Sequence, residues 1–178
     1  MTHAKFAKIK CNPIAKITER KAEKPGERLF IDTSGPFPQS IGGNTYWRGA
    51  VDDYSGKLFM EFGKTKSGMM EFIRKLLIFL KGRNMSCKFI RCDNAGEHEG
   101  LKSLVKEFGA DIEFTPPYSP QYNGRMERRF PVVLEQGMAM MVDAGFNKEF
   151  RRLIWAEAMW SHRQARHSLR TLFLTLFY

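Results

Sequence analysis

The chain has 178 residues, 43% of them hydrophobic, which suits one globular domain with some flanking sequence. Its formal net charge of +10 at pH 7 points to a polyanionic partner, most simply a nucleic acid. Three cysteines argue against a disulfide framework and for a reducing compartment, the N-terminus lacks a signal-peptide pattern, and no stretch approaches the roughly 20 apolar residues that span a membrane.

Residues 1–26 are expected to form a basic, largely irregular arm. Residues 1–28 contain eight Lys or Arg against three Glu, with little apolar periodicity. The run Cys11-Asn12-Pro13-Ile14 looks like half of a zinc knuckle with Ile14 in place of the second sulfur. A tetrahedral zinc site needs four ligands, which His3 and Cys11 cannot supply, so no zinc is predicted.

The first predicted strand, Arg28 to Thr33, places Asp32 near its end, just before the chain-breaking Ser34-Gly35-Pro36. A buried strand tolerates an aspartate only when the carboxylate is paired or bound to a metal. Two interpretations therefore stay open for Asp32: a site residue, or a residue that caps the turn.

Two further strands, Tyr46 to Val51 and Leu58 to Phe62, are predicted to form a hairpin through Asp53-Tyr54-Ser55-Gly56. Asp52 and Asp53 are adjacent, so in an extended chain their side chains point to opposite faces. We therefore assign both to the turn rather than to catalysis.

Apolar residues at helical spacing predict a helix over Lys66 to Lys81 and another over Glu99 to Phe108, ended by Gly82 and Gly109. Their inward residues are Met69, Phe72, Ile73, Leu76, Leu77 and Leu80 in the first helix, and Leu101, Leu104, Val105 and Phe108 in the second. A short strand over Asp111 to Phe114 follows.

The central stretch carries two more acids. A strand over Lys88 to Cys92 stops at Asp93, and a Pro- and Gly-rich loop over Thr115 to Gly124 leads into a helix that holds Glu127. Acids held close together need a divalent cation between them, and carboxylate oxygens suit Mg²⁺ or Mn²⁺. The alternative is that Asp93 only opens a β-turn and Glu127 is solvated.

The C-terminal part is predicted to contain two helices, within Gln121 to Gly145 and over Lys148 to Ala165. Pro131 should disturb the first helix and Gly137 should weaken it. The second should turn Phe150, Leu153, Ile154, Trp155 and Ala158 inward. Residues 161–178 form a divergent tail. Strands that alternate with helices in the second half predict a mixed α/β sheet with helices on its faces.

Four motifs, in order, resemble the integrase catalytic core of copia-type long-terminal-repeat retrotransposons, within the retroviral-type integrases. They are IDTSGP around Asp32, VDDYSGK at Val51 to Lys57, FIRCDNAGEH around Asp93, and PPYSPQYNGRMERRF around Glu127. The resemblance covers roughly Glu27 to Ala158, and WAEAM at Trp155 to Met159 resembles the family's next helix. It implies a catalytic core over residues 27–160, with residues 1–26 as the remnant of a zinc module.

The resemblance implies a ribonuclease H-like fold with a five-stranded mixed sheet flanked by helices. The first and fourth strands would lie side by side, so Asp32, Asp93 and Glu127 would be the catalytic and metal-binding residues. They would hold two Mg²⁺ or Mn²⁺ ions for 3′-end processing and DNA strand transfer. Residues matching the family's DNA-approaching segment and the adjoining cationic helix face are Gln121, Tyr122, Asn123, Arg125, Arg128 and Arg129.

By the same resemblance, the partners are element-end DNA, target DNA and further copies of the chain, with no membrane. The location would be intracellular, in the nucleus or a virus-like particle. Two alternatives stay open: a catalytically inactive nucleic-acid-binding remnant of this fold, and a related nuclease that acts on another substrate. Arg128 and Arg129 would be a plain solvated surface if neither contacts phosphate.

Overall fold

The computed structural model describes residues 21–92, 99–114 and 124–162, with Glu99 and Arg125 described by their backbone alone. A five-stranded mixed sheet runs through the described chain, and this confirms the predicted fold class. Its strands are β1 (Arg28–Ser34), β2 (Tyr46–Asp52), β3 (Leu58–Gly63), β4 (Phe89–Cys92) and β5 (Asp111–Phe114). They lie in the order β3-β2-β1-β4-β5.

The central strand is β1, which pairs antiparallel with β2 and parallel with β4. The first and fourth strands are therefore neighbours, as the resemblance implied. The helices are α1 (Met69–Lys81), α2 (Glu99–Glu107), α3 (Gly124–Asp143) and α4 (Lys148–Leu153), and residues 155–162 are also helical. None of the helices in the described ranges has the length and hydropathy to cross a membrane.

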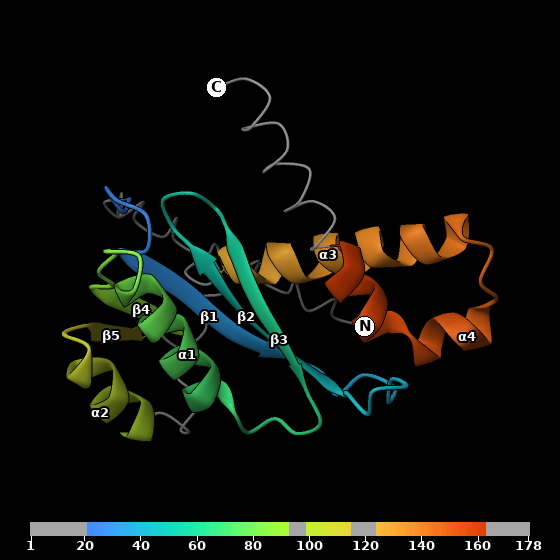
Figure 1. The fold of residues 1–178 in the computed structure, drawn as a ribbon, viewed down its shortest axis with the longest axis horizontal. Helices are drawn as coiled ribbons and strands as arrows, with labels where there is room; N and C mark the ends of the chain where they lie inside the picture. The colour runs from blue at the N-terminus through green and yellow to red at the C-terminus, as the bar shows by residue number, and fades with distance from the viewer. Residues whose placement is uncertain (1–20, 93–98, 115–123, 163–178) are drawn as a thin grey trace, which may run out of the picture.

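Two apolar clusters hold the helices on opposite faces of the sheet (Figure 1). The first joins α1 and α2 to Leu29, Ile31 and Ile90, and it contains the predicted inward residues of both helices. The second joins α3 and residues 155–159 to Phe30, Trp47 and Val51. Alternate β1 residues thus enter different cores, since successive strand side chains point to opposite faces.

The helix predicted over residues 148–165 is interrupted at Ile154, so the prediction of one continuous helix was wrong. Ile154 leaves helical geometry (φ −116°, ψ 17°), and the next residue, Trp155, donates its indole N–H to the Pro38 carbonyl at 2.7 Å. This break turns Trp155 into the core but leaves α4 outside it. Phe150 and Leu153 are consequently 39% and 48% exposed rather than buried.

Helix α3 continues through Pro131 as one element, so the disturbance expected there does not interrupt it. Its buried residues include Met126, Phe130 and Met141, and the Phe130 ring meets the Trp47 ring edge-on at 4.4 Å between centroids. Packing against the sheet on both sides of the proline therefore outweighs the one lost backbone hydrogen bond.

Asp52 and Asp53 stabilise the β2–β3 hairpin and the segment before β1. Asp52 accepts hydrogen bonds from Ser55 and from the Gly26 amide, the latter at 2.9 Å. Asp53 accepts the Ala22 amide at 2.7 Å. Both carboxylates are buried. The contacts of Asp52 with Ser55 confirm its assignment to the turn, whereas the Asp53 carboxylate binds the segment before β1.

Cys87 and Cys92 are buried free thiols. Burial raises the pKa of Cys87 to about 12, so this thiol stays protonated at neutral pH. The interpretation of these cysteines as ordinary core residues is confirmed.

The Glu27 carboxylate organises the turn that leads into β1. It accepts hydrogen bonds from Lys88 Nζ at 2.7 Å, from the Glu23 amide at 2.7 Å and from the Lys24 amide at 3.2 Å. These contacts, with the Lys88 bond the strongest cause, lower the pKa of Glu27 from 4.5 to about 2.

We expect Glu27→Gln to flatten the acid side of the stability profile. A depressed pKa in the folded state adds stability above pH 4.5 that is lost as the pH falls toward about 2. Urea unfolding at several pH values in this window measures the effect. Glu149→Gln, at an exposed site on α4, is the control and should keep the wild-type slope. An unchanged slope in Glu27→Gln would contradict the assignment.

Candidate active site

The Asp32 side chain lies on the face of β1 that is turned toward α3. Its strand neighbour Phe30 packs in the α3-side cluster, and Asp32 shares that face by strand alternation. The side chain is half-buried, and its Oδ1 accepts the Thr33 amide at 2.7 Å. The predicted acid is thus directed toward the helix that carries Glu127, rather than into the α1–α2 core.

The second predicted acid, Asp93, lies outside the described residues. The strand before it is described, and β4 ends at Cys92. Phe30 of β1 is in register with Arg91 of β4, and Asp32 and Asp93 each follow these residues by two positions in the sequence.

Glu127 lies in the first turn of α3 and is exposed. The residue before it, Met126, is fully buried and packs over Gly49 of β2. Gly49 is the cross-strand partner of Asp32. The start of α3 therefore rests on the strand pair that carries Asp32, with Glu127 on the solvent side of this contact.

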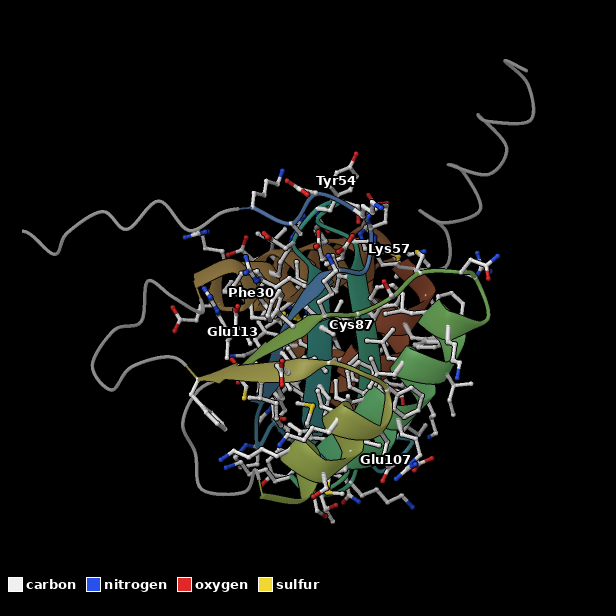
Figure 2. All side chains as sticks on the ribbon, turned by 90° about the vertical axis from the view of Figure 1, so that its left-hand side faces the viewer. Phe30, Tyr54, Lys57, Cys87, Glu107 and Glu113 are labelled. Atoms are coloured by element: carbon white, nitrogen blue, oxygen red, sulfur yellow. The ribbon has the colours of Figure 1, made fainter. Side chains whose placement is uncertain are left out.

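A buried ionic cluster lies on the same sheet face beside this contact. Arg91 donates to Glu113 Oε2 at 2.6 and 3.0 Å, and Arg28 donates to Glu113 Oε1 at 3.1 Å. Figure 2 shows Glu113 and Phe30 on the α3 side of the sheet and Glu107 on the opposite side. The cluster fixes the guanidinium of Arg91, two residues before Asp93.

Of the predicted DNA-contacting residues, Arg128 and Arg129 are exposed on the first turns of α3. Arg129 also donates to the Gly56 carbonyl at 3.0 Å, which ties α3 to the β2–β3 hairpin. Gln121, Tyr122 and Asn123 lie outside the described residues, as does the side chain of Arg125.

The carboxylates of Asp32 and Glu127 are hard oxygen donors of the kind that Mg²⁺ and Mn²⁺ prefer. Within residues 21–92, 99–114 and 124–162, no group of three potential metal ligands comes together. Two members of the predicted triad are described, and the donor chemistry fits a divalent ion.

A groove lined by described residues lies away from these acids. It has a volume of about 800 Å³ and runs between β3, α1 and residues 156–161. Asp32 and Glu127 do not line it.

Sequence reasoning missed Gly49 and the partnership of Arg91 with Glu113. A glycine inside an otherwise apolar strand was the available signal for the first. For the second, the signal was a buried arginine between apolar residues in one strand and a glutamate in another, but the pairing depends on the β4–β5 register.

The comparisons with known proteins give sequence relatives among plant transposons. The chain is 31% identical over 137 residues to the retrovirus-related Pol polyprotein from transposon TNT 1-94 of Nicotiana tabacum, covering 74% of the chain and 10% of that protein. It is 23% identical over 130 residues to that from transposon RE2 of Arabidopsis thaliana, covering 72% and 9%. The chain thus spans about a tenth of the length of these relatives. No family model matches.

A solved structure has the same fold. A chain of the simian T-cell lymphotropic virus intasome, in complex with PP2A regulatory subunit B56 gamma, superposes with a TM-score of 0.59 and 15% identity, over 80% of this chain and 50% of that one. The catalytic core domain of BIV integrase gives 0.49 and 17%, over 76% and 82%.

Proposed function

Since the chain belongs to the integrase catalytic cores of copia-type retrotransposons, we propose that it catalyses metal-dependent polynucleotidyl transfer on DNA, namely 3′-end processing and strand transfer. The observation that carries the proposal is the packing of α3 on the β1–β2 strand pair at Gly49, which brings the elements bearing Asp32 and Glu127 close to each other. The parallel pairing of β1 with β4 supports Asp93 as the third acid.

In this proposal, Asp32, Asp93 and Glu127 hold two Mg²⁺ or Mn²⁺ ions. When bound, these ions would activate the attacking hydroxyl or water and stabilise the leaving oxygen of an in-line phosphodiester displacement. The three carboxylates would hold the ions in a fixed arrangement and partly offset their positive charge. The rate enhancement would come mainly from positioning the reacting groups and from neutralising the charge of the phosphate.

The DNA would cross the N-terminal end of α3. Arg128 is exposed there and would contact phosphate, with Arg125 contributed by the first turn of α3 and Gln121, Tyr122 and Asn123 by the preceding segment. Arg129 would contribute less to DNA binding, because its guanidinium already donates a hydrogen bond to the Gly56 carbonyl. The net charge of +10 favours such contacts over the whole chain.

The proposed partners are element-end DNA, target DNA and further copies of the chain, in the nucleus or a virus-like particle. We also propose residues 27–160 as the catalytic core, preceded by the basic arm at 1–26 and followed by the divergent tail at 161–178.

The purified chain should join a short element-end duplex to target DNA with Mg²⁺ or Mn²⁺ and not with EDTA, and Mn²⁺ should raise its thermal unfolding temperature. Joined products on a denaturing gel and a thermal melt measure these effects. If the chain instead binds DNA with a steep salt dependence, without joining and without any response to metal, it is an inactive binding remnant. Faster cleavage of the RNA strand of a hybrid would indicate a related nuclease.

A further inference from the structure

Gly49 occupies an interior position of β2 that the backbone does not require to be glycine. Its φ lies outside the left-handed region, unlike that of Gly43 or Gly56. Glycine weakens a strand because it adds no side-chain packing, and inside a strand it often marks the close approach of another segment. The packing above position 49 explains why this residue is a glycine.

The space above Gly49 is filled by α3. A Cβ atom at position 49 would lie 2.6 Å from Met126 Cε and 3.3 Å from Phe130 Cε1, and the first distance is far shorter than real Cβ contacts. Met126 is fully buried and the Phe130 ring packs on Trp47, so neither side chain can swing into solvent. Two side chains from the first two turns of α3 therefore pack directly on the bare backbone of β2.

Both ends of this contact adjoin predicted catalytic acids. Gly49 is the cross-strand partner of Asp32, and Met126 immediately precedes Glu127. We propose that Gly49 is a positioning residue: the missing side chain sets the distance of the α3 N-terminus from β1, and hence that of Glu127 from Asp32. This inference rests on the proposed function, because it concerns the same three acids.

The contact can be tested by exchanging volume across it. Gly49→Val adds three carbons where Met126 Cε lies, and should lift the start of α3. Met126→Ala removes three heavy atoms from the same space and should leave a cavity. The double variant returns the removed volume from the strand side, and volume-conserving core exchanges are the best tolerated.

We expect Gly49→Val to lose most of the Mn²⁺-induced rise in unfolding temperature and to slow strand transfer by about 100-fold, the effect of a misplacement of about 1 Å. Gly49→Ala should show a smaller loss of both. The double variant Gly49→Val/Met126→Ala should recover both quantities to within a few-fold of wild type. Recovery in a double variant measures the coupling between the two sites directly.

Gly63→Ala is the matched control, because a Cβ there would press on the Arg48 guanidinium at the other side of the hairpin, away from the acids. It should lower the unfolding temperature yet keep the metal response. A normal metal response in folded Gly49→Val, or a double variant that regains stability without regaining the response, would overturn the inference. If wild type itself shows neither metal response nor joining, the proposed function fails and the inference fails with it.

Discussion

Asp32→Asn should reduce metal-dependent strand transfer by at least about 100-fold. Asparagine keeps the shape and the oxygen that accepts the Thr33 amide, but it removes the negative charge that a divalent ion requires. Loss of a group that only supports a metal ligand already costs about 10- to 100-fold in affinity or activity, so loss of a ligand should cost more. Joined products in single-turnover reactions with Mn²⁺ measure the rate.

Two comparisons make this test specific. Asp93→Asn should give a loss of similar size, while Glu71→Gln, at an exposed site on α1 across the sheet, should leave the rate unchanged. Asp32→Asn should also unfold near the wild-type temperature in EDTA but no longer gain stability from Mn²⁺. Full activity in Asp32→Asn would remove this residue from the site.

Glu113→Ala should destabilise the fold by about 1–3 kcal/mol, because it removes a partly buried carboxylate that accepts hydrogen bonds from two guanidinium groups. Glu113 accepts hydrogen bonds from both Arg28 and Arg91, whose side chains are only 13% and 9% exposed. Without the carboxylate, both guanidinium groups would lose a charged hydrogen-bond acceptor at a place with little access to water. The free energy of unfolding in urea measures the loss.

A glutamate in an exposed ion pair provides the matched control. Glu107 lies 3.6 Å from Arg74, and its side chain is 60% exposed, so Glu107→Ala should cost less than about 1 kcal/mol. Replacing Arg91 and Glu113 together by Met and Leu should recover part of the loss, because two buried charges are removed at once. A cost for Glu113→Ala as small as that for Glu107→Ala would show that the cluster is solvated.

The sheet could be predicted from the sequence because each strand is a short apolar run bounded by turn residues, and each long helix has a regular apolar stripe. Asp32 stood out for a related reason, as a carboxylate near the end of a buried strand. The order of strands was not visible in these patterns, and the resemblance implied only that the first and fourth strands are neighbours. Pairing depends on contacts between distant residues, such as Leu29 with Ile90, that local periodicity does not encode.

The wrong helix prediction and the missed role of Gly49 have the same origin, which is contact with distant residues. Residues 148–165 show helical periodicity throughout, yet the hydrogen bond from Trp155 to the Pro38 carbonyl joins residues 117 positions apart, and the helix breaks beside it. The role of Gly49 was missed because its partner, Met126, is supplied by a distant helix. The local sequence determines the secondary-structure propensity of a segment. The helix break beside Trp155 and the glycine at position 49 depend instead on distant residues that pack there.

The parallel pairing of β1 with β4 has a consequence for the order of events during folding. A hairpin and α1 intervene between the two strands, so Leu29 and Ile90 meet only after a loop of about sixty residues has closed. Contacts between residues so far apart in the sequence are slow to form, and they stabilise the chain substantially only when the sheet is nearly complete. The acid on β1 therefore acquires its neighbour strand late, and a nascent or partly unfolded chain lacks the arrangement proposed to act on DNA.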